Sequence, residues 1–217
     1  MASKNFKDAN GYLYRQDDTD VNTYHLHGWT DTTGATDALV LGSVITLICD
    51  FDLPNQTVFP QTAFTALNTL KISGWKSLAT FLPNATVVAT LDKLEINGTQ
   101  VNTITQQFNT VTDLMLINNE NLSNVSSPAW ALLERLVIIN CPFQKLPVAM
   151  NNAKVVHLEG TNITALLASI APEYLYISPR FFNATFSSEL QVTLPILLTR
   201  RDVKVSANSS THVIRID

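Results

Sequence analysis

One block of alternating apolar residues recurs along this chain at intervals close to 20 residues, and it limits the possible folds more than any other feature. The block has the form L-x-x-L-x-L, with other apolar residues at some positions. Its middle residues are Leu47, Leu70, Leu94, Leu114, Leu136, Val156 and Leu175, separated by 23, 24, 20, 22, 20 and 19 positions. Because each block hides only one face, several blocks must stack to form a continuous core. The spacing therefore predicts a solenoid of about seven repeats.

The pattern continues after each predicted strand. If the first apolar residue of a block is position one, the ninth position holds Thr99, Cys141 and Thr161, and Asn119 lies there or one residue early. A small polar or thiol side chain can turn inward here and hydrogen-bond backbone groups that are left unpaired as the chain leaves the strand. A second apolar pair follows at positions eleven and fourteen, as in Val101 and Ile104, Phe143 and Leu146, and Ile163 and Leu166.

At these residues the chain resembles the leucine-rich-repeat family, most clearly in LDKLEINGTQVNTI, LERLVIINCPFQKL and AKVVHLEGTNITAL. The resemblance covers roughly Val44 to Ile177 and implies a curved stack of short parallel strands, concave on the strand side and closed by loops or short helices on the convex side. The subclass is not assigned.

The expected fold is thus a β-rich α/β solenoid with an N-terminal cap segment at 1–43, repeats at 44–181 and a C-terminal repeat or cap at 182–217. The alternative is a right-handed parallel β-helix, whose turns have a similar length. The low count of 7 Gly speaks against it, because such coils rely on Gly-rich corners.

Alternation along the strands predicts which side chains face outward. In the blocks around Leu70 and Leu94 these side chains are polar, whereas from the block around Leu114 onward they form an apolar and aromatic patch edged by charge. The predicted contact residues are Met115, Ile117, Arg135, Val137, Ile139, Val155, His157, Tyr174 and Tyr176, with Asp113 and Glu159 at the edge. An apolar patch rimmed by charge is typical of a contact surface. The open alternatives are that the chain's own C-terminal segment or a second copy in a homodimer covers it.

Asparagine followed by x-Ser/Thr occurs eight times, at Asn55, Asn84, Asn97, Asn121, Asn124, Asn162, Asn183 and Asn208. Chance predicts about 3 or 4 such motifs in a chain of this composition. The excess indicates glycosylation in a eukaryotic secretory pathway, hence an extracellular or cell-surface protein. An Asn- and Thr-rich cytoplasmic solenoid would also generate such motifs by accident. The first ten residues are polar and have no apolar core of a signal peptide.

Charge and motifs argue against several other functions. The net charge is -4, without a basic stripe for nucleic acid or anionic lipid, and no apolar run is long enough to span a bilayer. Cys49 and Cys141 lie several repeats apart, so we expect two buried thiols rather than a disulfide. His25 and His27 alternate like metal ligands, with Asp17, Asp18 and Asp20 upstream, but a solvated cap segment explains them as well.

No residues are assigned to catalysis, and neither a metal nor another cofactor is expected. The sequence therefore predicts a non-catalytic recognition module for a protein or peptide ligand, such as the binding part of a receptor. The alternatives are an intracellular scaffold and, less favoured, a carbohydrate-active β-helix enzyme. An enzyme of that kind would need a cluster of carboxylates on one face of the solenoid.

Overall fold

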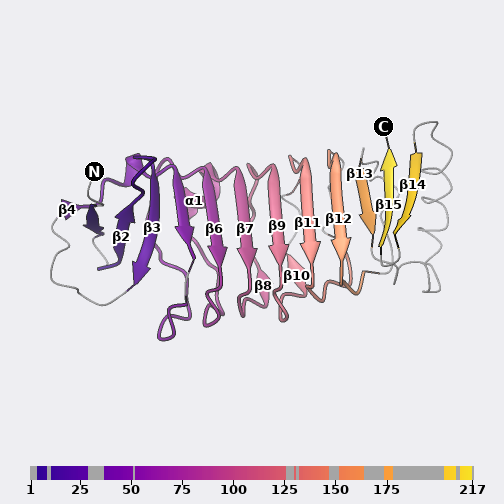
Figure 1. The fold of residues 1–217 in the computed structure, drawn as a ribbon. Helices are drawn as coiled ribbons and strands as arrows, with labels where there is room; N and C mark the ends of the chain where they lie inside the picture. Colours follow the sequence, from indigo (N-terminus) through magenta and orange to yellow (C-terminus); the bar gives the residue numbers. More distant parts are fainter. Residues whose placement is uncertain are drawn as a thin grey trace.

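The computed structural model of the chain is a β-rich solenoid whose strands lie side by side in one long sheet (Figure 1). It describes residues 4–8, 11–28, 37–50, 52–125, 130, 132–146, 152–163, 174–177, 203–208 and 211–216. Within these ranges, the sheet has 13 strands in the order β14-β15-β13-β12-β11-β9-β7-β6-β5-β3-β2-β1-β4. Successive strands of the central part are neighbours in the sheet, as expected for a coil that returns to the same face after each turn.

The predicted blocks form the parallel strands of this sheet. They are β5 (Thr46–Cys49), β6 (Thr69–Ser73), β7 (Lys93–Asn97), β9 (Asp113–Ile117), β11 (Arg135–Ile139), β12 (Val155–Glu159) and β13 (Tyr174–Ile177). The middle apolar residues of the blocks pair directly with one another from Leu47 to Leu175. The predicted register is therefore confirmed along the whole series.

The sheet continues into both segments that were predicted as caps, with reversals of strand direction. At the N-terminal end, β3 (Thr23–Gly28) is parallel to β5, but β2 (Leu13–Gln16) and β1 (Asn5–Lys7) form antiparallel pairs, and β4 (Asp37–Ala38) lies beside β1. At the other end, β15 (Thr211–Ile216) is antiparallel to both β13 and β14 (Val203–Asn208). Each end of the parallel stack thus adjoins antiparallel strands (Figure 1).

The return side of the coil contains little regular structure in the described residues. It includes the 3₁₀ turn η1 (Leu41–Ser43), the short helix α1 (Ala85–Thr90), and a parallel pair formed by β8 (Thr103–Ile104) and β10 (Asn124–Val125). Two of the predicted second apolar pairs, Val101 with Ile104 and Phe143 with Leu146, are buried there, and Ile163 is buried as well. Leu166, the expected partner of Ile163, lies outside the described residues. The helical part of the expected α/β fold is thus nearly absent from this part of the chain.

A row of aromatic rings runs through the core on the return side. Phe81 lies between Phe59 and Phe108, with ring centroids 5.3 and 6.1 Å away, and Phe108 lies 5.9 Å from Trp130. All four side chains are at most 1% exposed. Rings at these separations bury large apolar areas and interact favourably with one another, so they join successive coils on the side opposite the sheet.

A sharp turn follows five successive strands. The residue at this turn has a positive φ in every case: 72° at Gly74, 66° at Gly98, 52° at Asn118 and Asn140, and 59° at Gly160. Gly and Asn are the residues that adopt this left-handed conformation at least cost. A Cβ atom on Gly160 would also clash with Oδ1 of Asn140. Glycine therefore fits that turn without a shift of the Asn140 side chain.

Polar side chains at the ninth position point inward, as predicted. Thr99, Asn119, Cys141 and Thr161 are all at most 4% exposed. Oδ1 of Asn119 accepts hydrogen bonds from the Thr99 backbone N–H at 3.0 Å and from its hydroxyl at 2.8 Å, and Nδ2 of Asn119 donates to the Ile96 carbonyl at 2.8 Å. We call Thr99, Asn119 and Cys141 the inner polar ladder. It links three coils and supplies partners for backbone groups that turn away from the sheet.

Candidate functional site

The predicted contact residues lie on one face of β9, β11, β12 and β13, because they alternate with core residues along each strand. The side chains of Met115, Ile117, Arg135, Ile139, Val155, His157 and Tyr176 are partly exposed. The side chain of Tyr174 lies outside the described residues. In register, Met115, Val137, His157 and Tyr176 form one continuous row across the four strands. We call Met115, Ile117, Arg135, Val137, Ile139, Val155, His157 and Tyr176 together the strand-face patch.

Val137 departs from the prediction that all these residues are exposed. It points away from the core, yet only 4% of its surface is exposed. Its direct neighbours are Met115 on β9 and His157 on β12, both of which are longer. Because neighbouring strands are only about 4.8 Å apart, long side chains on both sides shield a short one between them. Val137 is therefore a buried support of the patch and offers little contact area.

An ion pair and a histidine–carboxylate contact lie within and beside the patch. Arg135 donates to both carboxylate oxygens of Asp113, at 3.0 and 3.2 Å. His157 Nε2 lies 3.2 Å from Oε2 of Glu159, and the His157 ring centroid lies 4.0 Å from that of Tyr176. These contacts orient the side chains of Arg135, His157 and Tyr176 within the chain itself. A preorganised surface loses less side-chain entropy on binding.

A shallow hollow of about 240 Å³ adjoins the patch on the side of β6 and β7. Its side-chain lining includes Thr69, Lys71, Lys93, Glu95 and Asp113, and Met115 lines both the hollow and the patch. Sequence reasoning missed this hollow. The sequence shows that the outward residues change from polar to apolar between β7 and β9. It does not show a depression, because that depends on how far each side chain extends from the sheet.

The candidate glycosylation sites differ in their accessibility. Among the sites whose side chains are described, Asn55, Asn121, Asn124 and Asn162 are exposed, whereas Asn84 and Asn97 are partly buried. Asn84 caps α1 by accepting a hydrogen bond from the Thr86 N–H at 3.0 Å. Oδ1 of Asn97 accepts a hydrogen bond from Asn118 at 3.3 Å. Asn183 and the side chain of Asn208 lie outside the described residues. Asn55, Asn121, Asn124 and Asn162 therefore meet the exposure that a glycan acceptor requires.

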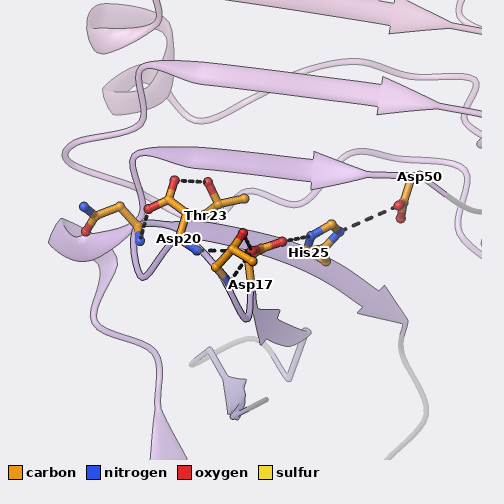
Figure 2. Close-up of polar contacts among 7 residues, drawn as sticks. Asp17, Asp20, Thr23, His25 and Asp50 are labelled. Atoms are coloured by element: carbon orange, nitrogen blue, oxygen red, sulfur yellow. Dashed lines mark hydrogen bonds and ion pairs between the residues drawn. The ribbon is translucent and has the colours of Figure 1, made fainter. Parts of the chain in front are cut away.

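The possible metal ligands near the N-terminus form a hydrogen-bonded cluster that includes two carboxylates around one imidazole (Figure 2). His25 Nε2 lies 3.2 Å from Asp17 Oδ2, and its Nδ1 lies 3.7 Å from Asp50 Oδ2. Hydrogen bonds from Thr19 and His25 hold the pKa of the Asp17 carboxyl below its usual value. Asp20 accepts hydrogen bonds from Asn22 and Thr23 instead (Figure 2). The described residues contain no group of three His, Cys, Asp or Glu side chains arranged to hold a metal ion. The side chain of His27 lies outside them.

Both cysteines are buried free thiols, as expected from their separation in the repeat. Burial raises the pKa of Cys49 and of Cys141, so both favour the neutral form, which is a poor nucleophile. Cys141 Sγ lies 3.8 Å from Nδ2 of Asn119 within the inner polar ladder. Cys49 therefore packs in the core, and Cys141 also donates to the carbonyls of Leu116 and Ile139, at 3.5 and 3.4 Å.

Comparisons with protein-family models, with curated proteins and with solved structures find no match to this chain. In the described part of the chain, no helix is long and apolar enough to cross a membrane.

Proposed function

We propose that this chain is a recognition module of the leucine-rich-repeat type that binds a protein or peptide through the strand-face patch. The observation that supports it most directly is the row from Met115 to Tyr176. Met115 and Tyr176 are partly exposed at its two ends, Val137 supports it from below, and the Arg135–Asp113 ion pair and the His157–Glu159 contact lie beside it. Met and Tyr supply large, adaptable contact area, and such residues are enriched at the centre of protein interfaces.

The repeat class and the number of about seven repeats belong to the same proposal. They are supported by the paired middle residues of the blocks, the inward polar residues at the ninth position, and the left-handed turn after each of five strands. A function without catalysis is supported by the buried thiols and by the hydrogen bonds that occupy the carboxylates of Asp17 and Asp20.

We expect truncation of the patch to remove partner binding while the fold remains intact. Met115→Ala and Tyr176→Ala should each lower the affinity for the partner by about 2 kcal/mol, roughly 30-fold, because central anchors carry most of the binding energy. The free energy of unfolding should change by about 1 kcal/mol or less, since both side chains are partly exposed. Proteins captured by the immobilised chain are identified by mass spectrometry, and binding of each is then measured by calorimetry.

Leu82→Ala is the matched control, because Leu82 is 40% exposed but lies in a loop away from the strand face. It removes an exposed apolar side chain of similar size and should leave capture unchanged. Equal loss of binding in all three variants would point to unspecific hydrophobic adsorption. Loss confined to Leu82→Ala would move the contact surface to the return side of the solenoid.

We further propose that the module works outside the cell and carries glycans. Expressed in a eukaryotic secretory host, the folded protein should be glycosylated at Asn162 and at two or more other sites, since most of the described acceptors are exposed. Intact mass before and after enzymatic deglycosylation measures the number of glycans, and Asn162→Gln should remove one of them. Secreted, folded protein with the bare peptide mass would instead favour the intracellular scaffold.

A further inference from the structure

A pocket of about 480 Å³ lies at the N-terminal end of the solenoid, far along the sheet from the strand-face patch. It opens between the end of β1, the segment from β4 to η1, and the loop at 61–63. Its lining includes Lys7, Asp8, Leu39, Leu41, Thr62 and Ala63. This volume is in the range of pockets that hold small molecules.

Asp8 brings a buried carboxylate to this pocket. It is only 9% exposed. Oδ1 of Asp8 accepts the Tyr12 N–H at 2.9 Å, and Oδ2 accepts the hydroxyls of Thr62 at 2.5 Å and Tyr14 at 3.3 Å. Burial is the main cause that raises the pKa of Tyr14, and the charge of Asp8 acts in the same direction, so the phenol keeps its proton and donates. These donors come from the residue just before β2, from β2 itself and from the loop at 61–63, and they fix the carboxylate in place.

The rest of the lining offers one cation and several apolar surfaces. The side chain of Lys7 is exposed, and it takes part in none of the ion pairs found in the described residues. Leu39 is buried and Leu41 is partly buried, so both present apolar atoms. A complementary ligand therefore has an ammonium group for the carboxylate, an anionic group for the lysine, and an apolar body between these polar ends and the leucines.

We propose that this pocket binds a small zwitterion with an apolar body, of the chemical class of the apolar amino acids. The ammonium group of the ligand pairs with the Asp8 carboxylate, whose position is fixed by the hydrogen bonds that it accepts. The carboxylate of the ligand pairs with Lys7, whose flexible chain adapts to its position. The aliphatic part contacts Leu39 and Leu41. This site is independent of the strand-face patch and of the partner that the patch binds.

The test uses the full chain and three probes with the same branched aliphatic body. L-Leucine carries both charges, 3-methylbutylamine carries only the ammonium group, and 4-methylpentanoate carries only the carboxylate. We expect saturable binding of L-leucine in calorimetry, and affinities about ten-fold or more weaker for the two singly charged probes, since each loses one charge-assisted contact.

Two variants separate ligand binding from folding. Asp8→Asn should weaken L-leucine binding about ten-fold or more, but it also removes acceptors that the fold uses. Lys7→Ala changes an exposed side chain and keeps the fold. It should weaken L-leucine binding about ten-fold while leaving 3-methylbutylamine unchanged, and Lys76→Ala, also exposed, should change neither. Absence of saturable leucine binding to the folded parent, or equal affinities for all three probes, would overturn the proposal and leave Asp8 with a structural role.

Discussion

Replacing Leu136 with Asp is expected to abolish cooperative folding of the solenoid. Leu136 is fully buried in β11, and it pairs with Leu114 on one side and Val156 on the other. An isolated carboxylate in this core costs about 4 kcal/mol or more, a large part of the total stability of an ordinary domain. Thermal and urea unfolding followed by circular dichroism should show no cooperative transition.

The matched control is Leu132→Asp, the same substitution four positions earlier at a side chain that is 51% exposed. Its melting curve should stay close to that of the parent. An unchanged melting curve for Leu136→Asp as well would contradict the strand register, because the core would then not contain this side chain.

A second large effect is expected when the inner polar ladder is broken. Asn119→Leu keeps the approximate volume of the side chain but removes the acceptor for the Thr99 N–H and hydroxyl and the donor to the Ile96 carbonyl. Each buried group left without a partner costs about 1 to 3 kcal/mol. We expect the free energy of unfolding to fall by about 3 kcal/mol, measured by urea denaturation.

Asn102→Leu provides the comparison, because Asn102 is an exposed asparagine on the neighbouring coil. This change should alter the free energy of unfolding by about 0.5 kcal/mol or less. If Asn119→Leu lowered the free energy of unfolding no more than Asn102→Leu does, the hydrogen bonds of the inner polar ladder would contribute no net stability. Apolar packing alone would then hold these coils together.

The strand register was predictable because it follows from the regular spacing of apolar residues along the sequence. Leu94, Leu114 and Leu136 share one environment in successive coils, so the same residue type recurs at each. The inward Thr99 and Asn119 were predictable for the same reason. In a stack in which each unit contacts mainly its neighbours, local repetition determines long-range pairing.

Other features depend on properties that repetition does not encode. Val137 occupies an outward position but is buried, because the lengths of Met115 and His157 decide its exposure. The aromatic row from Phe59 to Trp130 lies in return segments of variable length, so its members have no fixed spacing in the sequence. The pocket at Asp8 joins residues 7 and 8 to residues 61–63, and no periodic pattern links those segments.

The reversal of strand direction beside both ends of the parallel stack has a consequence for assembly. A parallel stack that simply stopped would offer a whole strand edge of free N–H and C=O groups, on which another copy could continue the same coil into a filament. Here β2 is antiparallel to β3, β1 is antiparallel to β2, and the edge strand beyond them, β4, has only two residues. Beyond β13, β15 runs antiparallel and the edge strand β14 returns to the direction of β13. The edge of the parallel stack is therefore covered at both ends by strands of the same chain, and at the N-terminal end the two-residue edge strand offers few free backbone groups to another copy.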